Sequence, residues 1–453
     1  MASRAGGADA ATIEREDQVV AKVSRRLIWF LFVMYIFSYL DRINTSFAAL
    51  TMNRDLMLSA TAFGMASTIF SIGYLIFDVP SNLMLARTGA RIWLPRIMIT
   101  WGVASAATSL AVGPISLYVI RFIVGAAEAG FLAGVLLYLS YWFPASHRGR
   151  ATGVFMAAAP FTIVIGAPIS GLFLNMHGFL GLAGWRWLFL LEGAPSVIVG
   201  VIAYFYLSDR PRTAPWLSDD EKDLLEGRIA RERAAEPAAG KTDSIWRELA
   251  SPTVLALCLA YFCIVTTVNT NAVWAPQIVA AMMKSTGGFA GGFVGVGLIT
   301  ALPSLVALVV LPLWTLRSDR RQERTWHTVA ALAAAALGWV LVLVSTEPLF
   351  RLPGLILMTA GAFTAMAVFW TIPTMALSSR ASPAGIGLIS SAGIAASIIT
   401  PLVVGVLKDR MGNFTGGVTY ALALLVVCIV VVLALRPRRP VGAVAAPAPE
   451  PLA

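Results

Sequence analysis

Twelve stretches of the sequence are long and apolar enough to cross a lipid bilayer as helices, and this constrains the fold more than any other feature. A membrane-spanning helix needs about 20 mainly apolar residues. The stretches are 27–49, 62–85, 93–112, 116–142, 152–174, 187–207, 254–281, 293–316, 328–345, 353–377, 385–407 and 418–435. Because 58% of the 453 residues are hydrophobic and only 13% are charged, a water-soluble protein is excluded. The predicted fold class is an all-α, multi-pass membrane protein.

The longest polar stretch divides these helices into six and six. The sequence predicts five parts: an N-terminal tail (1–26), a six-helix bundle (27–207), a linker (208–252), a second six-helix bundle (253–436) and a disordered tail (437–453). Inside the linker, Ser218 and Glu221 have the spacing of a capping box and predict the start of a surface helix.

Basic residues indicate which side of the membrane each loop faces. Most of the 34 Lys and Arg residues fall in the two tails, the linker and alternate loops. Loops rich in Lys and Arg stay in the cytoplasm. We therefore expect both termini in the cytoplasm, and this asymmetry explains the net charge of +10 without a nucleic-acid partner.

Two of the apolar stretches carry charges where lipid would be expected. Arg121 and Glu128 are seven residues apart, so two helical turns bring them to one face. The first stretch carries Asp41, Arg42 and Asn44. A charge in hydrocarbon costs several kcal/mol, so such residues face a bundle interior or a watery cavity and mark a substrate or proton path. The two helices are predicted to face each other.

The acids and arginines of this pair have distinct predicted roles. Asp41 and Glu128 are the candidate proton carriers, with Arg121 as an ion partner that is bound in one state and released in another. The alternative is a static ion pair that only orients the helices. Arg42 offers a planar fork for a carboxylate. It could instead balance Asp41, but chain neighbours on a helix diverge by about 100°.

Other chemistries find no support in the sequence. Cys258, Cys263 and Cys428 lie in apolar runs and are interpreted as core residues, and the histidines do not cluster, so no metal site is predicted. The glycine-rich runs lack a following Gly-Lys-Ser/Thr, which excludes a phosphate loop. No nucleophile–base set appears, so neither an enzyme nor an organic cofactor is expected.

Several motifs in order carry a resemblance to a known family. The motifs are Tyr39-Leu-Asp-Arg-Ile-Asn44, Asp78-Val-Pro-Ser-Asn82, Arg87-Thr-Gly-Ala-Arg91, Arg121-Phe-Ile-Val-Gly-Ala-Ala-Glu-Ala-Gly-Phe131, Gly184-Trp-Arg-Trp187, Ser318-Asp-Arg320, Trp370-Thr-Ile-Pro373 and Gly405-Val-Leu-Lys-Asp409. With them the chain resembles the anion:cation symporter family of the major facilitator superfamily, which includes bacterial permeases for tartrate, phthalate and hydroxyphenylacetate. The likeness covers nearly all of 27–420.

The resemblance implies two six-helix bundles around a central cavity that opens alternately to each side of a bacterial inner membrane. It implies uptake of organic anions, usually carboxylates, driven by protons or another cation, with proton coupling at the positions of Asp41, Glu128 and Arg121. We expect a monomer that imports a small organic carboxylate by proton symport. At Ile389-Ser-Ser391 and Gly393-Ile394 the chain lacks the asparagines that the family often has, and Asp78 replaces a frequent Glu. Both departures argue against a polyhydroxylated substrate and favour a more apolar acid. Tartrate-like hydroxy diacids and aromatic acids both stay open as substrates.

The resemblance marks Tyr39 and Tyr74 as positions that line the substrate cavity, and charged, polar and aromatic residues of the other spans add further binding and gating candidates. The substrate-binding candidates are Arg42, Tyr39, Tyr74, Asn269, Asn271, Trp274, Trp370 and Ser390. For the asparagines, hydrogen bonds between helices are the alternative, and for the tryptophans it is packing. The gating or structural candidates are Asp78, Arg87, Arg91, Asp319 and Arg320.

Two other functions remain open from the sequence. One is an antiporter that exports a cationic or amphipathic drug, against which the paired arginines argue. The other is a membrane receptor that binds a ligand without moving it, against which the short tails argue. The predicted partners are thus a small organic anion, protons and the lipid bilayer.

Overall fold

The computed structural model of the chain describes residues 2–235, 249–285, 291–321, 323–345, 347–376 and 382–435. Almost all of these residues are helical. The tail expected at 437–453 lies outside the described residues.

The N-terminal half of the chain contributes eight α-helices to the bundle. They are α1 (Ala2–Asp55), α2 (Ala60–Thr88), α3 (Ala90–Ala107), α4 (Pro114–Glu128), α5 (Phe131–Trp142), α6 (Ala145–Met156), α7 (Ala158–Leu174) and α8 (Gly184–Tyr206). The linker contains α9 (Asp219–Ala235). The C-terminal half contributes α11 (Pro252–Ser285), α12 (Gly292–Arg321), α13 (Thr325–Val344), α14 (Pro348–Phe369), α15 (Thr371–Ala376), α16 (Ser382–Met411) and α17 (Thr415–Ala434).

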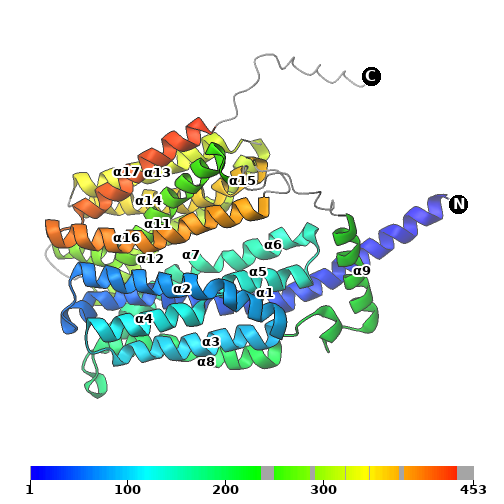
Figure 1. Cartoon of the computed structure of the whole chain (residues 1–453), viewed down its shortest axis with the longest axis horizontal. Helices are drawn as coiled ribbons and strands as arrows, with labels where there is room; N and C mark the ends of the chain where they lie inside the picture. The colour runs from blue at the N-terminus through cyan, green and yellow to red at the C-terminus, as the bar shows by residue number, and fades with distance from the viewer. Residues whose placement is uncertain are drawn as a thin grey trace, which may run out of the picture.

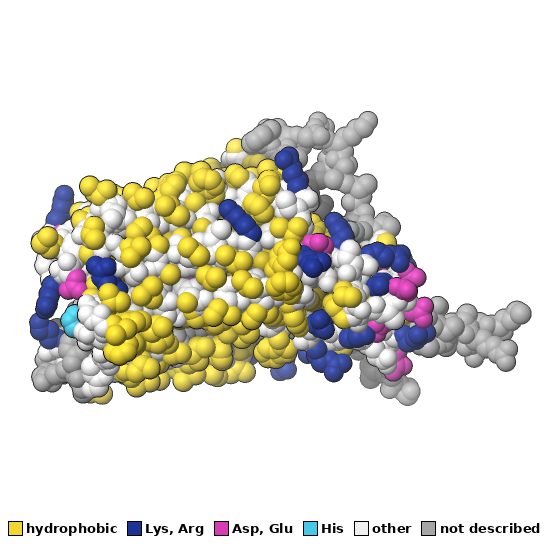
Figure 2. Space-filling model, turned by 90° about the horizontal axis from the view of Figure 1, so that it is seen from below, with side chains coloured by type: hydrophobic (Ala, Val, Ile, Leu, Met, Phe, Trp, Pro, Cys, Tyr) yellow, Lys and Arg dark blue, Asp and Glu magenta, His cyan; other side chains and the backbone are white. Residues whose placement is uncertain are grey.

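These helices form membrane spans. Ten spans among the described residues are long and apolar enough to cross a bilayer. Some combine consecutive helices, as α4 with α5 over Pro114–Trp142 and α6 with α7 over Ala145–Leu174. The apolar stretch 27–49 within α1, together with α3, completes the predicted twelve. On the face shown in Figure 2, hydrophobic side chains cover the broad middle of the molecule, and most Lys and Arg side chains lie toward its two ends.

The two halves lie against each other along paired helices. Figure 1 shows the C-terminal helices above the N-terminal ones, with α9 and the start of α1 at one end, here called the linker end. α2 packs on α16, and α7 packs on α12. A Cβ on Gly64 of α2 would lie 2.2 Å from the Pro401 carbonyl oxygen of α16, so glycine permits this close approach.

Contacts between the halves are found toward the opposite end, here called the far end. There, Asp409 of α16 accepts hydrogen bonds from the backbone N–H groups of Ala60 and Thr61 at 2.9 and 2.7 Å. These two residues begin α2, and an anion at a helix N-terminus is favoured by the helix dipole and the unpaired N–H groups. The bond therefore ties the halves together at the far end.

A break between α4 and α5 sets the position of Glu128. Glu128 is the last residue of α4, and Gly130 follows in the left-handed region with φ +84. The Gly130 N–H donates to Asp78 Oδ1 at 3.0 Å, so a carboxylate of α2 satisfies the opened backbone. A Cβ on Gly130 would approach Ser81 Oγ to 2.4 Å. Glycine is therefore required at the break by both conformation and space.

The linker helix α9 docks on the part of α1 that precedes the membrane. The capping box predicted at its start is confirmed: Glu221 N donates to Ser218 Oγ at 3.3 Å and Ser218 N donates to Glu221 Oε2 at 2.9 Å. Lys22 of α1 pairs with Glu221 at 2.7 Å, and Arg228 of α9 pairs with Asp17 of α1 at 2.6 Å. These ion pairs hold the linker against the N-terminal half.

We expect Arg228→Ala to loosen α9, measured as faster amide hydrogen exchange in 219–232. The hydrogen bond from Arg228 lowers the pKa of Asp17, and that from Lys22 lowers the pKa of Glu221. A carboxylate whose pKa is lowered in the docked state stabilises docking at pH values above the usual carboxyl pKa. That stabilisation is lost as the pH falls through the lowered pKa. The same loosening is therefore expected in the unaltered chain below about pH 4.

Arg212→Ala is the matched control for this linker experiment. Arg212 pairs with Asp223 and Glu226 inside the linker, so its loss removes a charge without cutting the bridge to α1. Equal exchange in the Arg228 variant and this control would contradict the proposed docking role.

Candidate functional site

A cavity of about 250 Å³ lies between the two halves near the middle of the spans. From the N-terminal half, Tyr39, Arg42 and Arg121 line it. From the C-terminal half, α11 and α16 contribute Asn269 and Ser397. Four of these residues had been expected in a substrate or proton path, and the structure brings them together from segments far apart in the sequence.

Arg42 and Glu128 form an ion pair at the edge of this central cavity. The Arg42 Nε donates to Glu128 Oε1 at 2.7 Å, and Ser38 Oγ donates to the same oxygen at 3.3 Å. Glu128 is only 1% exposed and its other oxygen has no partner. The Arg42 side chain is 34% exposed and lies over the Tyr74 ring at 5.3 Å. The buried acid is thus balanced by an arginine that reaches the cavity.

Arg121 lines the same cavity, and among the described residues no carboxylate pairs with it. It is 5% exposed, its guanidinium lies 4.5 Å from the centre of the Phe70 ring, and its Nε has no hydrogen-bond partner. A buried cation whose donors are not satisfied is costly unless a ligand pairs with it. This geometry favours an anion beside Arg121.

The opposite wall of the central cavity is polar and aromatic. Asn269 Nδ2 donates to Ser397 Oγ at 3.0 Å and to the Val265 carbonyl at 3.1 Å. Tyr261 lines the cavity and packs edge-on against Trp370, with ring centroids 4.8 Å apart. Asn269 therefore both faces the cavity and joins α11 to α16. Trp370 contacts Tyr261 but does not itself line the cavity.

Asp41 points away from the central cavity into the N-terminal half. Its oxygens accept hydrogen bonds from Trp101 Nε1 at 2.5 Å, Ser105 Oγ at 2.6 Å, Asn44 Nδ2 at 2.9 Å and Ser196 Oγ at 3.3 Å. It is 3% exposed. The two candidate proton carriers therefore occupy different environments: Glu128 meets an arginine, and Asp41 meets neutral donors of α1, α3 and α8.

Other binding candidates lie away from the cavity lining. Trp274 is fully buried and packs edge-on against two phenylalanine rings. Its ring centroid lies 5.2 Å from that of Phe63 and 5.8 Å from that of Phe414. Asn271 and Ser390 are partly buried and are not among the residues that line the central cavity. Their substrate-binding role stays a prediction.

Three of the gating candidates, Asp78, Arg91 and Asp319, contact residues of their own half or of the linker. Asp78 accepts from Gly130, and the Arg91 N–H donates to Asp209 Oδ1 at 2.8 Å. Asp319 pairs with Arg324. Arg87 and Arg320 are exposed at the helix ends. A latch between the halves made by these residues stays a prediction for another state.

Sequence reasoning missed several residues of the cavity. Ser67 and Ser71 of α2, together with Tyr261 and Ser397, line it. The Ser71 hydroxyl donates to the Ser397 carbonyl at 3.3 Å. Ser67 and Ser71 are four residues apart, which places both on one helix face, and that spacing was the available signal.

The charge of the cavity limits what it can hold. Among the described residues, the charged side chains in its lining are Arg42 and Arg121. The residues that the structure describes contain no group of three or more His, Cys, Asp or Glu side chains that could hold a metal ion. With Glu128 balancing one arginine, the site carries a net positive charge, so it suits a small anion with hydroxyl groups to meet the serines.

Comparisons with known proteins agree with this architecture. The chain is 44% identical over 425 residues to an Agrobacterium vitis protein named "Putative tartrate transporter", covering 94% of this chain and 96% of that one. It is 33% identical to the "Quinolone resistance transporter" of Acinetobacter baumannii, covering 89% of this chain and 92% of that one. These relatives are transporters, not enzymes.

A solved structure shares the fold at low sequence identity. The crystal structure of the D-xylose-proton symporter superposes with a TM-score of 0.70 at 15% identity, covering 92% of this chain and 97% of that one. The predicted twelve transmembrane helices in two six-helix bundles around a central cavity are thereby confirmed. The model of the family described as "Major Facilitator Superfamily" matches residues 31–386. The chain therefore belongs to the Major Facilitator Superfamily.

Proposed function

We propose that the protein imports a small organic carboxylate by proton symport. The observation that carries the proposal is the central cavity, where Arg121 has an unpaired donor and Arg42 is balanced by a single buried acid. A carboxylate fits the planar fork of an arginine. Binding an anion there would supply the charge that the cavity lacks.

The coupling between proton and anion follows from the Arg42–Glu128 pair. When Glu128 is ionised, it holds the Arg42 Nε at 2.7 Å. A proton on Glu128 removes the charge that holds Arg42, and the guanidinium becomes available to a carboxylate in the cavity. Each ligand then favours binding of the other, because they act on one shared equilibrium.

Asp41 is proposed as the second acid of the proton path. Asp41 lies between Tyr39 and Arg42 in α1. Those two residues line the central cavity, whereas Asp41 faces α3 and α8. Ser105 and Ser196 give it a line of hydroxyl groups inside the N-terminal half. We propose that Glu128 binds Arg42 when it is ionised and releases it when it is protonated. We propose that Asp41 is a second proton-binding site deeper in the N-terminal half.

Alternating access would move the halves against each other around this site. The contacts of α2 with α16 and the Asp409 bond to the start of α2 lie at the far end. In our proposal these contacts separate when the cavity opens toward the far end, which faces the outside of a bacterial inner membrane. The linker end is assigned to the cytoplasm, and we propose that both termini lie on that side. One chain contains the whole cavity, so a monomer suffices.

The substrate is proposed to be a small hydroxy acid such as tartrate. The relatives from Agrobacterium vitis carry tartrate in their names. The cavity volume of about 250 Å³ is below the usual range for drug-sized ligands, about 300–1,000 Å³. Hydroxyl groups of Ser67, Ser71 and Thr45 in the lining could meet those of the acid.

Export of a drug is the second candidate, because a quinolone resistance transporter is 33% identical to the chain. Two features argue against it. The lining arginines repel a cationic drug, and the cavity is small for a quinolone. An exporter would also lower the cellular content of its substrate, which distinguishes it from an importer.

Uptake into proteoliposomes tests the proposed function. We expect the full chain to accumulate radiolabelled tartrate when the outside is one pH unit more acidic than the inside, and to lose accumulation when a protonophore is added. A gradient of this size is worth about 1.4 kcal/mol per proton, or about tenfold accumulation. Tartrate uptake that is saturable but indifferent to the gradient would reject proton coupling. No saturable uptake would reject tartrate as the substrate.

A further inference from the structure

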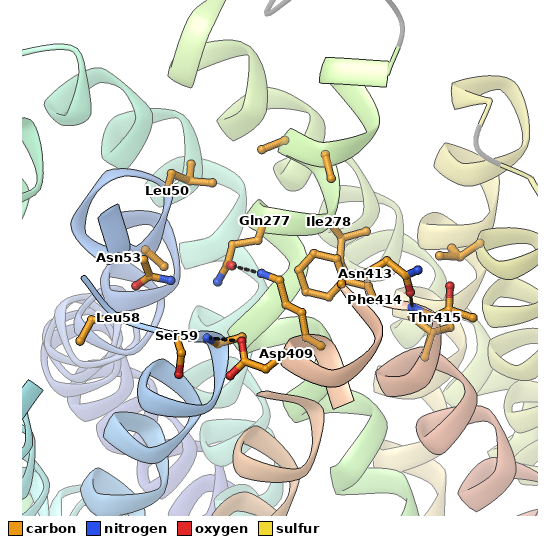
Figure 3. A pocket seen from close by; sticks show the side chains of 18 of the residues that line it. Leu50, Asn53, Leu58, Ser59, Gln277, Ile278, Asp409, Asn413, Phe414 and Thr415 are labelled. Carbon is orange, nitrogen blue, oxygen red and sulfur yellow. Dashed lines mark hydrogen bonds between the residues drawn. The ribbon is translucent and has the colours of Figure 1, made fainter. Parts of the chain in front are cut away.

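A second and larger cavity, of about 720 Å³, lies between the halves at the far end. Figure 3 shows Leu50, Asn53 and Leu58 of the N-terminal half on one side, and Gln277, Asp409 and Phe414 of the C-terminal half on the other. We call this cavity the far-end vestibule. The comparisons and the sequence motifs give it no function.

The vestibule is separated from the central cavity by buried aromatic rings. Phe63 lines the central cavity. Its ring packs edge-on against Trp274 with centroids 5.2 Å apart, and both side chains are fully buried. On the vestibule side, the Trp274 ring lies 5.2 Å from Lys408 Nζ. An anion in the vestibule is therefore one aromatic pair away from the proposed transport site.

Charge in the vestibule is mostly positive. Of the described residues that line it, Arg54, Arg351 and Lys408 are basic, and Asp409 is acidic. The two oxygens of Asp409 accept the N–H groups that begin α2, so its charge is compensated by that helix end. Walls of one sign of charge concentrate counter-ions. The vestibule thus attracts small anions.

Lys408 and Gln277 supply directed donors at the wall. Lys408 Nζ donates to Gln277 Oε1 at 2.8 Å (Figure 3) and lies 4.2 Å from the Phe414 ring centroid. An ammonium has three N–H donors, and this bond uses one. Because Oε1 faces the lysine, the Gln277 amide nitrogen points elsewhere. It is buried and has no partner among the described residues, and Gln277 as a whole is 9% exposed. An oxyanion in the vestibule would satisfy remaining donors of Lys408, while Gln277 holds the ammonium in place.

We propose that the far-end vestibule is a first binding site for the carboxylate substrate, which Lys408, positioned by Gln277, holds before the substrate passes Phe63 and Trp274 to the central cavity. The proposal rests on the proposed function for the identity of the ligand. The site itself rests on the vestibule's own residues, so it can be tested without transport.

The first test measures the local potential with charged thiol reagents. Ala281 lines the vestibule and is exposed, so Ala281→Cys is placed in the full chain with its three natural cysteines replaced by alanine. Rates are measured in proteoliposomes at low salt with an anionic and a cationic methanethiosulfonate reagent. We expect Lys408→Gln to lower the anionic-to-cationic rate ratio about fivefold, and Lys408→Arg to preserve it.

Arg410→Gln is the matched control for charge on the same helix. Arg410 is exposed, two residues from Lys408, and outside the vestibule lining. We expect less than about a twofold change in its rate ratio, since an exposed charge outside the cavity is screened. An unchanged ratio in Lys408→Gln, or an equal drop in the control, would overturn the anion-attracting role of Lys408.

The second test asks whether tartrate occupies the vestibule itself. Tartrate is expected to slow modification of Ala281→Cys, and Lys408→Gln to abolish that protection. Arg121→Gln, which impairs the central cavity, should leave the protection in place. Loss of protection in the Arg121 variant would show that tartrate acts only from the central cavity and would overturn the vestibule site. Protection in the absence of gradient-driven uptake would reject the proposed function and keep the site.

Discussion

Glu128→Gln is expected to abolish proton-driven accumulation of tartrate while leaving exchange of tartrate across the membrane partly intact. Glutamine has nearly the shape of glutamate but neither ionises nor takes up the proton. Arg42, which donates to Glu128 at 2.7 Å, would then stay available to the anion whatever the proton gradient. Accumulation at a gradient of one pH unit should fall from about tenfold to about onefold.

The measurement compares two assays on the same proteoliposomes. One follows radiolabelled tartrate under an inward proton gradient, and the other follows its exchange with internal unlabelled tartrate without a gradient. The control is Glu192→Gln, because Glu192 is also 1% exposed in the N-terminal half but accepts a hydrogen bond from Ser170 Oγ, whereas Glu128 pairs with Arg42. Gradient-driven accumulation that survives Glu128→Gln would remove Glu128 from the coupling mechanism.

Arg121→Gln is expected to weaken tartrate binding about 10- to 100-fold. A hydrogen bond to a charged group contributes about 1.5–3 kcal/mol, and the Arg121 Nε is buried beside the cavity with no protein partner. Arg121→Lys keeps the charge but not the planar fork, so an intermediate loss is expected.

Equilibrium binding of radiolabelled tartrate to purified protein measures this effect, with thermal melting as the check on folding. Arg96→Gln serves as the control, since Arg96 is an exposed arginine of α3 outside both cavities. An Arg121→Gln variant that melts normally and binds tartrate as tightly as the unaltered chain would contradict the assignment of Arg121 to the anion.

Much of the architecture was predictable because its signals are local. The length of each apolar segment can be read directly from the sequence, so twelve spans could be counted without knowledge of their packing. The capping box at Ser218 and Glu221 is equally local, and the structure shows both of its hydrogen bonds. The motifs around Arg121 pointed to the family that the comparisons show.

The pairing within the candidate site was harder to predict, because it depends on how whole helices are rotated. The sequence placed Arg121 as the partner of the acids, whereas in the structure Arg42 pairs with Glu128. Similarly, Trp274 was a candidate for the substrate site, and the structure packs it between Phe63 and Phe414.

By itself, the sequence determined that the chain crosses the membrane repeatedly and that Asp41, Arg42, Arg121 and Glu128 lie within it, since hydropathy and charge are properties of single segments. Only the tertiary structure decided which of these charges share the cavity. The break at Gly130, the packing of α1 on α8 and the hydrogen bonds from α3 turn Glu128 toward Arg42 and Asp41 toward Trp101. Such rotations arise from contacts between distant segments, and the periodicity of one helix does not encode the rotation of its neighbour.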